Sequence, residues 1–177
     1  MMPPLYEMVI KPKVKRFECY TSCAAFPVFF SCYGDIWMAQ SFTPQVNHTL
    51  KHVKLRAIRH DTPGTLTFSV RLADAEHLPI GGDLSTGIYD GDSLPEGLWD
   101  DAVWFEVPMS PLALVAETEY VIVMGAPDAA GSATFDATGC STPGGYARGI
   151  NSDSDDGGSN WYANPTADVF FEEWGIP

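Results

Sequence analysis

One acidic stretch contains the residue types that bind metal ions. It places carboxylate or amide oxygens at nearly alternate positions: Asn151, Asp153, Asp155 and Asp156. Oxygen ligands spaced in this way are typical of the first half of a calcium-binding loop. The match is incomplete, because Asp156 occupies the position that needs a glycine and Tyr162 the position that needs a glutamate. Calcium is therefore the candidate ion, no cofactor is required, and a solvated hairpin tip is the alternative interpretation.

Five aromatic residues could form a platform for sugar rings. They are Trp99, Trp104, Tyr146, Trp161 and Tyr162. Trp and Tyr combine a large apolar surface with one polar group, which suits both ligand stacking and core packing. The alternative is therefore that these five side chains fill the core. Because the acidic stretch lies beside Trp161, we expect any glycan or calcium site near residues 153–162 or on an exposed aromatic face.

The sequence shows no catalytic motif. It lacks a Gly-x-Ser-x-Gly sequence, a phosphate-binding loop and a zinc-hydrolase motif. The adjacent acids Asp100-Asp101 and Glu172-Glu173 should point to opposite faces of their strands and so cannot act as pairs. His48 and His52 would lie about 13 Å apart on a strand, too far to share one ion. We predict a non-catalytic protein, with a polysaccharide-active enzyme as the remaining alternative.

Charge is distributed unevenly along the chain. Four basic residues lie within residues 1–16, namely Lys11, Lys13, Lys15 and Arg16, whereas the whole chain has a formal net charge of -13. An acidic domain repels nucleic acid and anionic membranes. No stretch approaches the ~20 apolar residues of a membrane helix. We predict no nucleic-acid partner, no membrane insertion, and a basic arm over residues 1–16 that docks onto an acidic partner surface.

The four cysteines do not form a recognisable framework. Cys19 and Cys23 would lie about 13 Å apart on a strand, whereas disulfide-bonded Cα atoms lie within about 7 Å. Only a turn at Thr21-Ser22 would bring that pair together, and the absence of Cys-x-x-Cys disfavours zinc. We therefore expect Cys19, Cys23, Cys32 and Cys140 to be free, buried thiols.

One glycosylation sequon occurs, Asn47-His48-Thr49. The N-terminal residues 1–7 lack the charged-then-apolar pattern of a signal peptide. We therefore interpret the match as chance.

The elements that position these residues are strands. Apolar and polar residues alternate over 53–57 and again over 66–72, which predicts two strands with one buried face each. Pro63-Gly64 between them is a turn signal, so we predict an antiparallel hairpin. Further strands are expected over 17–30, 37–42, 85–89, 99–107, 120–124, 133–138, 146–151 and 168–174. The region 108–116 should be a connection, and no helix is expected.

This spacing of short strands and turns predicts a single all-β domain over residues 17–177, an antiparallel jelly-roll β-sandwich behind the arm. The run 120–124 is apolar on both faces and should form a central, covered strand. The predicted core contains Val53, Leu55, Phe68, Val70, Phe105, Ile122 and Phe171.

Several short motifs occur in an order that resembles a known family. They are Ala39-Gln40-Ser41-Phe42-Thr43-Pro44, Pro63-Gly64-Thr65-Leu66-Thr67, Gly82-Asp83-Leu84-Ser85-Thr86-Gly87, residues 112–123, Asp156-Gly157-Gly158-Ser159-Asn160-Trp161 and the closing Asp168-Val169-Phe170-Phe171. Over residues 17–175 this order resembles the choice-of-anchor R domains, carbohydrate-binding-module-like jelly rolls of microbial surface and virion-associated proteins. The resemblance implies a non-catalytic sandwich and supplies no binding residues.

From the resemblance and the missing export signal we expect an exposed structural or decoration protein of a virion, with an adhesion role at the virion surface. The arm would dock it onto other virion or surface proteins, and a glycan is the candidate ligand. Neighbouring copies could also pair, and closed rings are the common outcome of such self-association. The alternative is a secreted or cell-surface glycan-binding module of a microbe.

Overall fold

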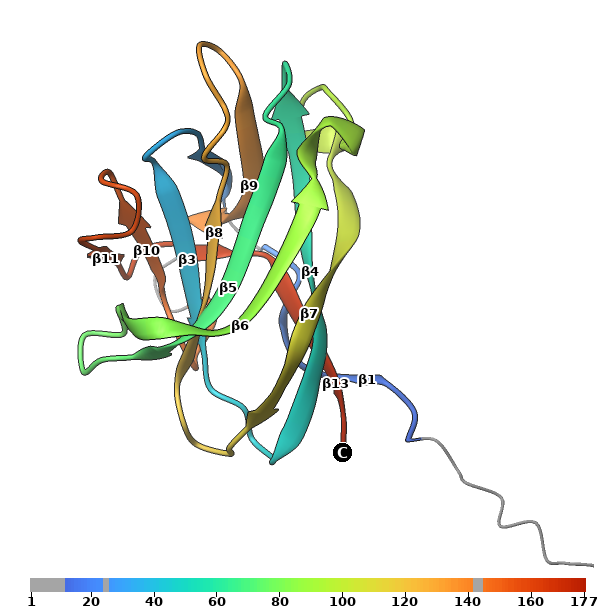
Figure 1. Cartoon of the computed structure of the whole chain (residues 1–177), viewed down its shortest axis with the longest axis vertical. Helices are drawn as coiled ribbons and strands as arrows, with labels where there is room; N and C mark the ends of the chain where they lie inside the picture. Colours follow the sequence, from blue (N-terminus) through green and yellow to red (C-terminus); the bar gives the residue numbers. More distant parts are fainter. Residues whose placement is uncertain (1–11, 24–25, 142–144) are drawn as a thin grey trace, which may run out of the picture.

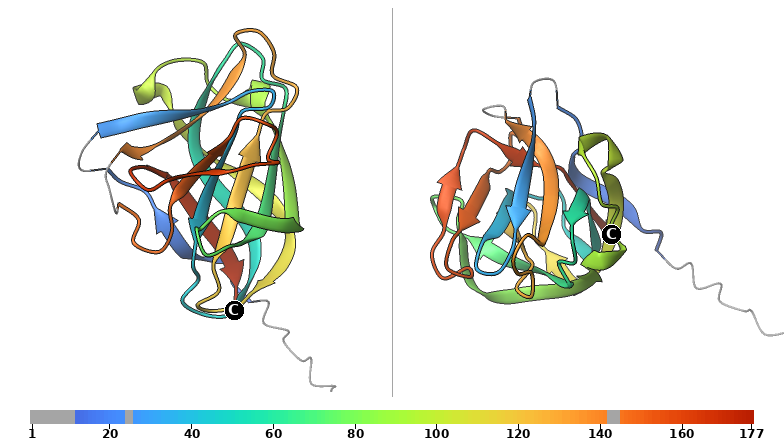
Figure 2. Two further views of the ribbon diagram at one scale, coloured as in Figure 1. Left: turned by 90° about the vertical axis from the view of Figure 1, so that its left-hand side faces the viewer. Right: turned by 90° about the horizontal axis from the view of Figure 1, so that it is seen from above.

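The computed structural model describes residues 12–23, 26–141 and 145–177. Its strands form two antiparallel sheets that pack face to face, as the prediction of an all-β jelly-roll sandwich requires (Figures 1 and 2). Two short 3-10 turns, η1 (Gly91–Ser93) and η2 (Trp99–Asp101), lie outside the sheets. No helix in the described part of the chain is long and apolar enough to cross a membrane.

The larger sheet has seven strands. Its main path runs β1-β13-β4-β9-β12, with β2 beside β9 and β7 beside β4. The bounds are β1 (Lys15–Tyr20), β2 (Phe26–Cys32), β4 (His48–His60), β7 (Val103–Leu114), β9 (Thr134–Ser141), β12 (Asp168–Val169) and β13 (Phe171–Ile176).

The smaller sheet has six strands in the order β11-β10-β3-β8-β5-β6. The bounds are β3 (Trp37–Phe42), β5 (Thr65–Ala73), β6 (Pro79–Asp90), β8 (Tyr120–Gly125), β10 (Asn151–Ser154) and β11 (Tyr162–Asn164).

The core fills the space between the two sheets. Every residue predicted to be in it is buried: Val53, Leu55, Phe68, Val70, Phe105, Ile122 and Phe171. All six residues of β8 are buried, which confirms the prediction of a central strand covered on both faces. The alternating pattern identifies core residues because successive side chains of a strand point to opposite faces of the sheet.

The predicted hairpin between the two alternating strands is wrong. β4 belongs to the seven-stranded sheet and β5 to the six-stranded sheet, so residues 61–64 connect the sheets. Asp61 and Gly64 both adopt positive φ (50° and 72°) in this connection. The Asp61 carbonyl accepts a hydrogen bond from Arg59, and its carboxylate accepts one from Ser132. The alternation identified two strands and their buried faces, but it carries no information about which sheet each strand joins.

Three other boundaries differ from the prediction. Residues 108–114, expected to be a connection, continue β7, and Pro108 is tolerated because β7 pairs with β4 alone. Residues 99–101, expected to begin a strand, form η2, so the opposite-face argument does not apply to Asp100 and Asp101. Of the strand expected over 146–151, only Asn151 is in a strand, and Tyr146 packs into the core.

The cysteine prediction is wrong for one pair. Cys23 and Cys140 form a disulfide that ties the chain after β1 to β9, with Cα atoms 5.5 Å apart. Cys19 and Cys32 are free, and only Cys32 is fully buried. Spacing arguments considered the near neighbour Cys19, whereas the bonded partner is 117 residues away along the chain.

β1 is attached through a buried histidine. The His48 ring stacks on Phe17 of β1 at 3.7 Å between centroids, and His48 Nε2 lies 2.8 Å from Glu173 Oε2 of β13. Both side chains of this ion pair are fully buried. Because β1 begins at Lys15, the last two residues of the predicted arm belong to the sandwich.

Candidate functional site

A hollow with apolar and polar lining residues lies on the outer face of the six-stranded sheet. It has a volume of about 450 Å³ and spans β3, β8, β5 and β6, which lie side by side in Figure 1. Alternation along β5 explains its chemistry: Leu66, Phe68 and Val70 point into the core, so Thr67, Ser69 and Arg71 are left on the outer face. We call this hollow the groove.

Trp37 at the start of β3 forms one wall of the groove. Its indole lies against Gly125, where an added Cβ would sit 2.9 Å from the ring. The indole Nε1–H donates to the Gly34 carbonyl at 2.9 Å, which fixes the orientation of the ring. A glycine at position 125 is therefore required for Trp37 to lie over the sheet.

Trp161 supports this wall from the neighbouring hairpin tip. Gly158, at φ 81°, lies between the two indoles, because an added Cβ would approach the rings of both Trp37 and Trp161. Trp161 Nε1–H donates to the Gly158 carbonyl at 3.1 Å. Two tryptophans that are 124 positions apart are thus held next to one short loop.

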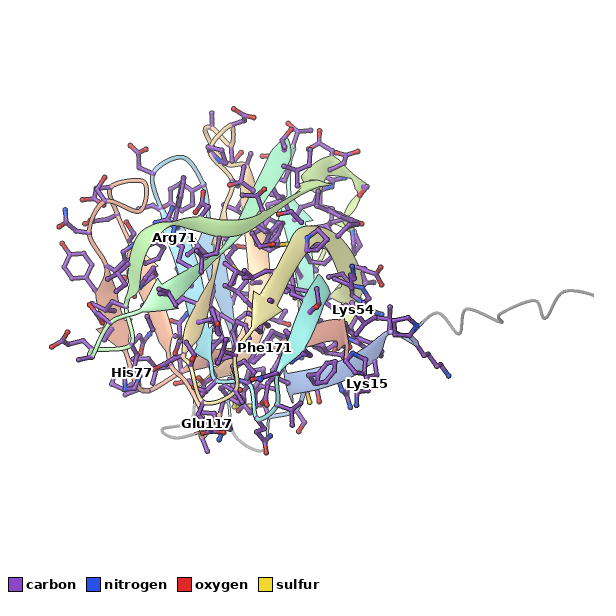
Figure 3. The ribbon with its side chains drawn as sticks, turned by 60° about the horizontal axis from the view of Figure 1, so that its bottom comes forward. Lys15, Lys54, Arg71, His77, Glu117 and Phe171 are labelled. Carbon is purple, nitrogen blue, oxygen red and sulfur yellow. A yellow bond between two sulfur atoms is a disulfide. The ribbon has the colours of Figure 1, made fainter. Side chains whose placement is uncertain are left out.

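The opposite side of the groove is charged. Arg71 Nε donates to Asp83 Oδ1 at 2.7 Å, and both residues line the groove; Figure 3 marks Arg71. Burial alone would raise the pKa of Asp83, but the Ser69 hydroxyl and the Arg71 guanidinium outweigh it and lower that pKa. Asp83 is therefore an ionised acceptor at neutral pH beside a guanidinium donor.

Together these residues offer an apolar wall and a small number of polar groups that point into one hollow. Ligand sites are typically built in this way, with apolar walls for contact area and few polar groups for orientation. A polyol such as a saccharide has C–H faces for the wall and hydroxyls for Asp83, Arg71, Thr67 and Thr86. No protein-family model and no curated protein matches the chain.

The five aromatic residues proposed for a sugar platform do not lie together. Trp99 and Trp104 lie on the seven-stranded side, where Arg56 lies 5.1 Å over the Trp99 ring and pairs across the strands with Trp104. Tyr162 is exposed on the edge strand β11. Only Trp161 lies near the groove, through its contact at Gly158. Trp37, Arg71 and Asp83 were missed by the sequence argument.

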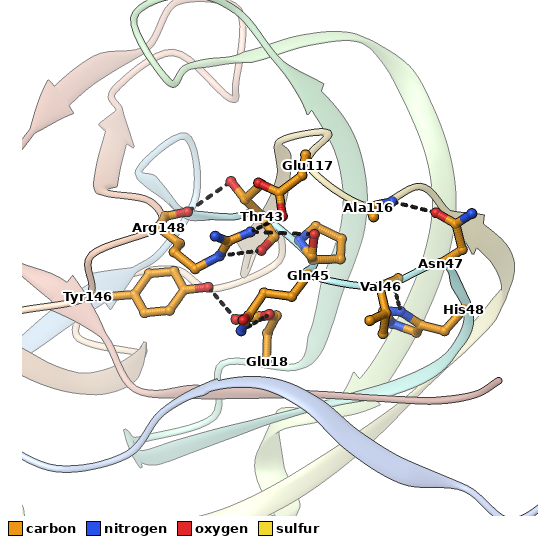
Figure 4. A network of polar contacts seen from close by, with 11 residues as sticks. Glu18, Thr43, Gln45, Val46, Asn47, His48, Ala116, Glu117, Tyr146 and Arg148 are labelled. Carbon is orange, nitrogen blue, oxygen red and sulfur yellow. Dashed lines mark hydrogen bonds and ion pairs between the residues drawn. The ribbon is translucent and has the colours of Figure 1, made fainter.

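Tyr146 is buried, with only 7% of its surface exposed. Its hydroxyl donates to Glu18 Oε2 at 3.0 Å (Figure 4). Its amide donates to Asp168 Oδ2 at 2.9 Å. Burial, reinforced by Glu18, raises its pKa. Tyr146 is a core residue, as the alternative interpretation of the aromatic set allowed.

The proposed calcium ligands have other contacts. Asp156 Oδ1 accepts hydrogen bonds from the Ser159 and Asn160 amides and the Ser154 hydroxyl, at 2.8 to 3.0 Å. These bonds, led by those from Asn160, lower the pKa of Asp156 and tie the hairpin tip together.

The other three proposed calcium ligands differ in how deeply they are buried. Asn151 is fully buried and donates to the Ala39 carbonyl, Asp153 is partly buried, and Asp155 is exposed. Burial, followed by the charge of Asp155, raises the pKa of Asp153. Across residues 12–23, 26–141 and 145–177, no three acidic, histidine or cysteine side chains converge on a position for a metal ion.

The basic residues proposed for docking are only partly described. Lys11 lies outside the described residues, and Lys13 is exposed ahead of β1. Lys15 Nζ lies 4.7 Å over the Phe17 ring, and Arg16 donates to Glu172 Oε1 at 2.5 Å. The hydrogen bond with Glu172 raises the pKa of Arg16. Lys15 and Arg16 thus hold β1 in place, whereas Lys13 is the described residue left for a partner.

A second polar hollow lies at one end of the sandwich, lined by His77, Glu117, Glu119 and Arg148. Its charged groups form ion pairs with one another: His77 with Glu119 at 2.8 Å, and Arg148 with Glu117 at 3.1 Å. Arg148 also donates to the Thr43 carbonyl at 2.8 Å (Figure 4). These contacts connect loops from distant parts of the chain, and we assign the hollow a structural role.

Proposed function

We propose that this chain is a non-catalytic binding module that holds a saccharide in the groove on its six-stranded sheet. The observation that carries the proposal is the pairing of the Trp37 wall with the Arg71–Asp83 ion pair across one open hollow. Aromatic faces pack against the C–H surfaces of sugars, and charged hydrogen bonds to hydroxyls give orientation.

The groove lacks the acid pair that sugar hydrolysis uses. Asp83 is the one carboxylate among the described residues that line it, and it is paired with Arg71. Glycosidases need two carboxyl groups, one on each side of the scissile bond, about 5 to 10 Å apart. The geometry therefore favours binding over turnover, and a polysaccharide-active enzyme stays the less favoured alternative.

We further propose that the module works on the surface of a virion, as a decoration protein with an adhesion role, and that a microbial cell surface is the alternative setting. Two observations support an exposed location. The Cys23–Cys140 disulfide suits an oxidising environment, and the resemblance to surface and virion-associated jelly rolls points the same way.

The docking element in this proposal is the arm that precedes β1. β1 ends the main path of its sheet, and among residues 12–23, 26–141 and 145–177 no strand pairs with its outer edge, so another strand could be added there. The start of β1 lies beside the C-terminal strand β13, since Lys15 pairs with Gly175, and Figure 1 shows β1 on the same side of the molecule as the C-terminus. An arm extending from this edge could reach a neighbouring protein or a second copy.

Deletion of residues 1–13 tests the arm without removing β1, which starts at Lys15. We expect the shortened chain to fold and to be lost from particles. Unchanged incorporation would remove the docking role of the arm. Absence of the intact protein from purified particles would contradict the virion setting.

A saccharide array followed by calorimetry tests the binding function. We expect at least one saccharide to bind the wild-type chain and to bind Asp83→Asn less tightly. Glu106→Gln is the matched control, because Glu106 is a similarly exposed carboxylate that pairs with Lys54 on the opposite sheet. A blank array, or equal losses in the two variants, would contradict the assignment of the groove.

A further inference from the structure

The sequon at residues 47–49 has a geometry suited to N-glycosylation. Asn47 is exposed in the loop before β4, while the intervening His48 side chain is fully buried against Glu173. Since neighbouring side chains of an extended chain point to opposite sides, Asn47 and Thr49 lie on the outer side together. The two residues that a glycosylating enzyme must reach are therefore presented on the same side.

The hydrogen bonding of Asn47 leaves the reactive atom available. Its Oδ1 accepts from the Ala116 amide at 2.7 Å, and Figure 4 shows the side-chain nitrogen directed away from that bond. A glycan attaches to Nδ2 and leaves Oδ1 as an amide carbonyl. The bond to Ala116 can therefore persist after modification.

Two exposed apolar residues flank this asparagine. Val46 precedes it and Val115 precedes its hydrogen-bond partner, and each is 51% exposed. The C–H face of a first sugar on Asn47 would cover apolar surface of this kind. A small apolar border around a modified asparagine gives a reason for two valines at a loop surface.

The disulfide supplies an independent argument. Cys23 and Cys140 are bonded, and such bonds form in oxidising compartments, among them the endoplasmic reticulum lumen where sequons are also read. The interpretation of the sequon as a chance match took account of neither this disulfide nor the exposure of Asn47. The exposed sequon and the disulfide together favour a chain that matures in such a compartment.

We infer that Asn47 carries an N-linked glycan. In that reaction Asn47 Nδ2 forms a bond to the anomeric carbon of a lipid-linked oligosaccharide. The bond from that carbon to the lipid pyrophosphate breaks, the pyrophosphate leaves with the electron pair, and Nδ2 loses one proton. The inference is separate from the groove, since it assigns a covalent modification to the loop that joins β3 to β4, and Asn47 does not line the groove.

The test is mass spectrometry of the protein recovered from the cells or particles that naturally contain it. The digest is treated with a glycan-releasing amidase in heavy-oxygen water, which converts a glycosylated asparagine into a labelled aspartate. We expect the label at Asn47. Asn164 in Asn164-Pro165-Thr166 is an internal control, because proline in the middle position blocks the sequon.

Two variants made in the same cells separate modification from folding. Thr49→Val removes the sequon and Thr49→Ser keeps it, and both leave the Asn47–Ala116 hydrogen bond intact. We expect complete loss of the label in Thr49→Val and its retention in Thr49→Ser. An unlabelled Asn47 in the wild-type digest, or a label that survives Thr49→Val, overturns the inference.

Discussion

The two outer faces of the sandwich use similar residues in different ways. On the six-stranded sheet, Trp37 and the Arg71–Asp83 pair lie on either side of an open groove. On the seven-stranded sheet, Lys54 Nζ lies 4.9 Å over the Trp174 ring and 3.5 Å from Glu106, so the charged and aromatic groups contact one another directly. We call this second surface the paired face.

The difference teaches that exposed aromatic and charged residues do not by themselves make a site. On the paired face, the Trp174 indole donates to Glu172 at 2.7 Å and its ring stacks on His52 at 5.6 Å. Side chains from neighbouring strands therefore occupy the space between the charged and aromatic groups on this face. On the groove face, β5 and β8 place Thr67, Ser69 and Val123 below the level of the walls and leave a hollow. Open space between polar groups is what distinguishes the groove.

The largest expected effect is a difference in stability between two substitutions on β13, one on the paired face and one in the core beneath it. Glu172 and Glu173 are neighbours on β13, but Glu172 lies on the paired face and Glu173 is fully buried with His48. We expect Glu173→Ala to lower the free energy of unfolding by roughly 3–5 kcal/mol, because it leaves a buried histidine unpaired. We expect Glu172→Ala to cost about 1 kcal/mol or less, because Arg16 is partly exposed.

Chemical denaturation measures both variants under the same conditions. A similar loss in the two would show that the paired face stabilises the fold as strongly as the buried pair does. That outcome would contradict the distinction between surface and core ionic contacts on β13.

A smaller effect compares the two faces directly. We expect Trp37→Ala to weaken saccharide binding at least tenfold, about 1.4 kcal/mol, because buried tryptophan contacts dominate many binding energies. Trp104→Ala is the matched control, since Trp104 is 38% exposed on the seven-stranded side. Calorimetry gives both affinities, and thermal melting verifies that each variant is folded. An equal loss of saccharide affinity in Trp104→Ala would contradict the assignment of the ligand to the groove.

The third prediction concerns two histidines on β4. Burial alone would lower the pKa of His48, but hydrogen bonds to Glu173 and Val46 outweigh it and raise that pKa. Burial lowers the pKa of His52, which lies on the paired face. Unfolded histidine titrates near 6.5. The stability contributed by protonated His48 is therefore lost as pH rises above about 6.5, whereas for His52 stability is lost as pH falls below about 6.5.

Unfolding measured across pH distinguishes these signs. We expect His48→Gln to flatten the decline above about pH 6.5 and His52→Gln to flatten the decline below it. Each slope should be at most about 1.4 kcal/mol per pH unit. Burial also raises the pKa of Glu173, which adds to the loss with rising pH. Opposite assignments of the two variants would contradict the burial of His48 and its pairing with Glu173.

The sequence predicts the strands and the core better than it predicts their partners. The alternation over 53–57 and 66–72 identified buried residues correctly, but a period of two does not specify whether consecutive strands share a sheet. Cys23 and Cys140 pair because β2 and β9 are neighbours, which is a contact across 117 residues. Such long-range pairing leaves no local signal.

The candidate site was harder to predict for the same reason. Trp37 and Gly125 lie on strands β3 and β8, which are far apart in sequence and adjacent in space. Arg71 and Asp83 are brought together by a register shift between β5 and β6 after Val70. The aromatic residues that the sequence favoured were selected by type, whereas the groove depends on which outward positions neighbouring strands place side by side.

The most direct test of the groove is nuclear magnetic resonance of the nitrogen-15-labelled chain, titrated with a saccharide that the array shows to bind. We expect backbone amide shifts confined to the groove strands, at Thr67, Ser69, Thr86 and Val123, together with a shift of the Trp37 indole proton. The amides of Lys54, Glu106 and Trp174 on the paired face should not move. Shifts centred on the paired face, or at the hairpin tip alone, would contradict the assignment of the groove as the binding site.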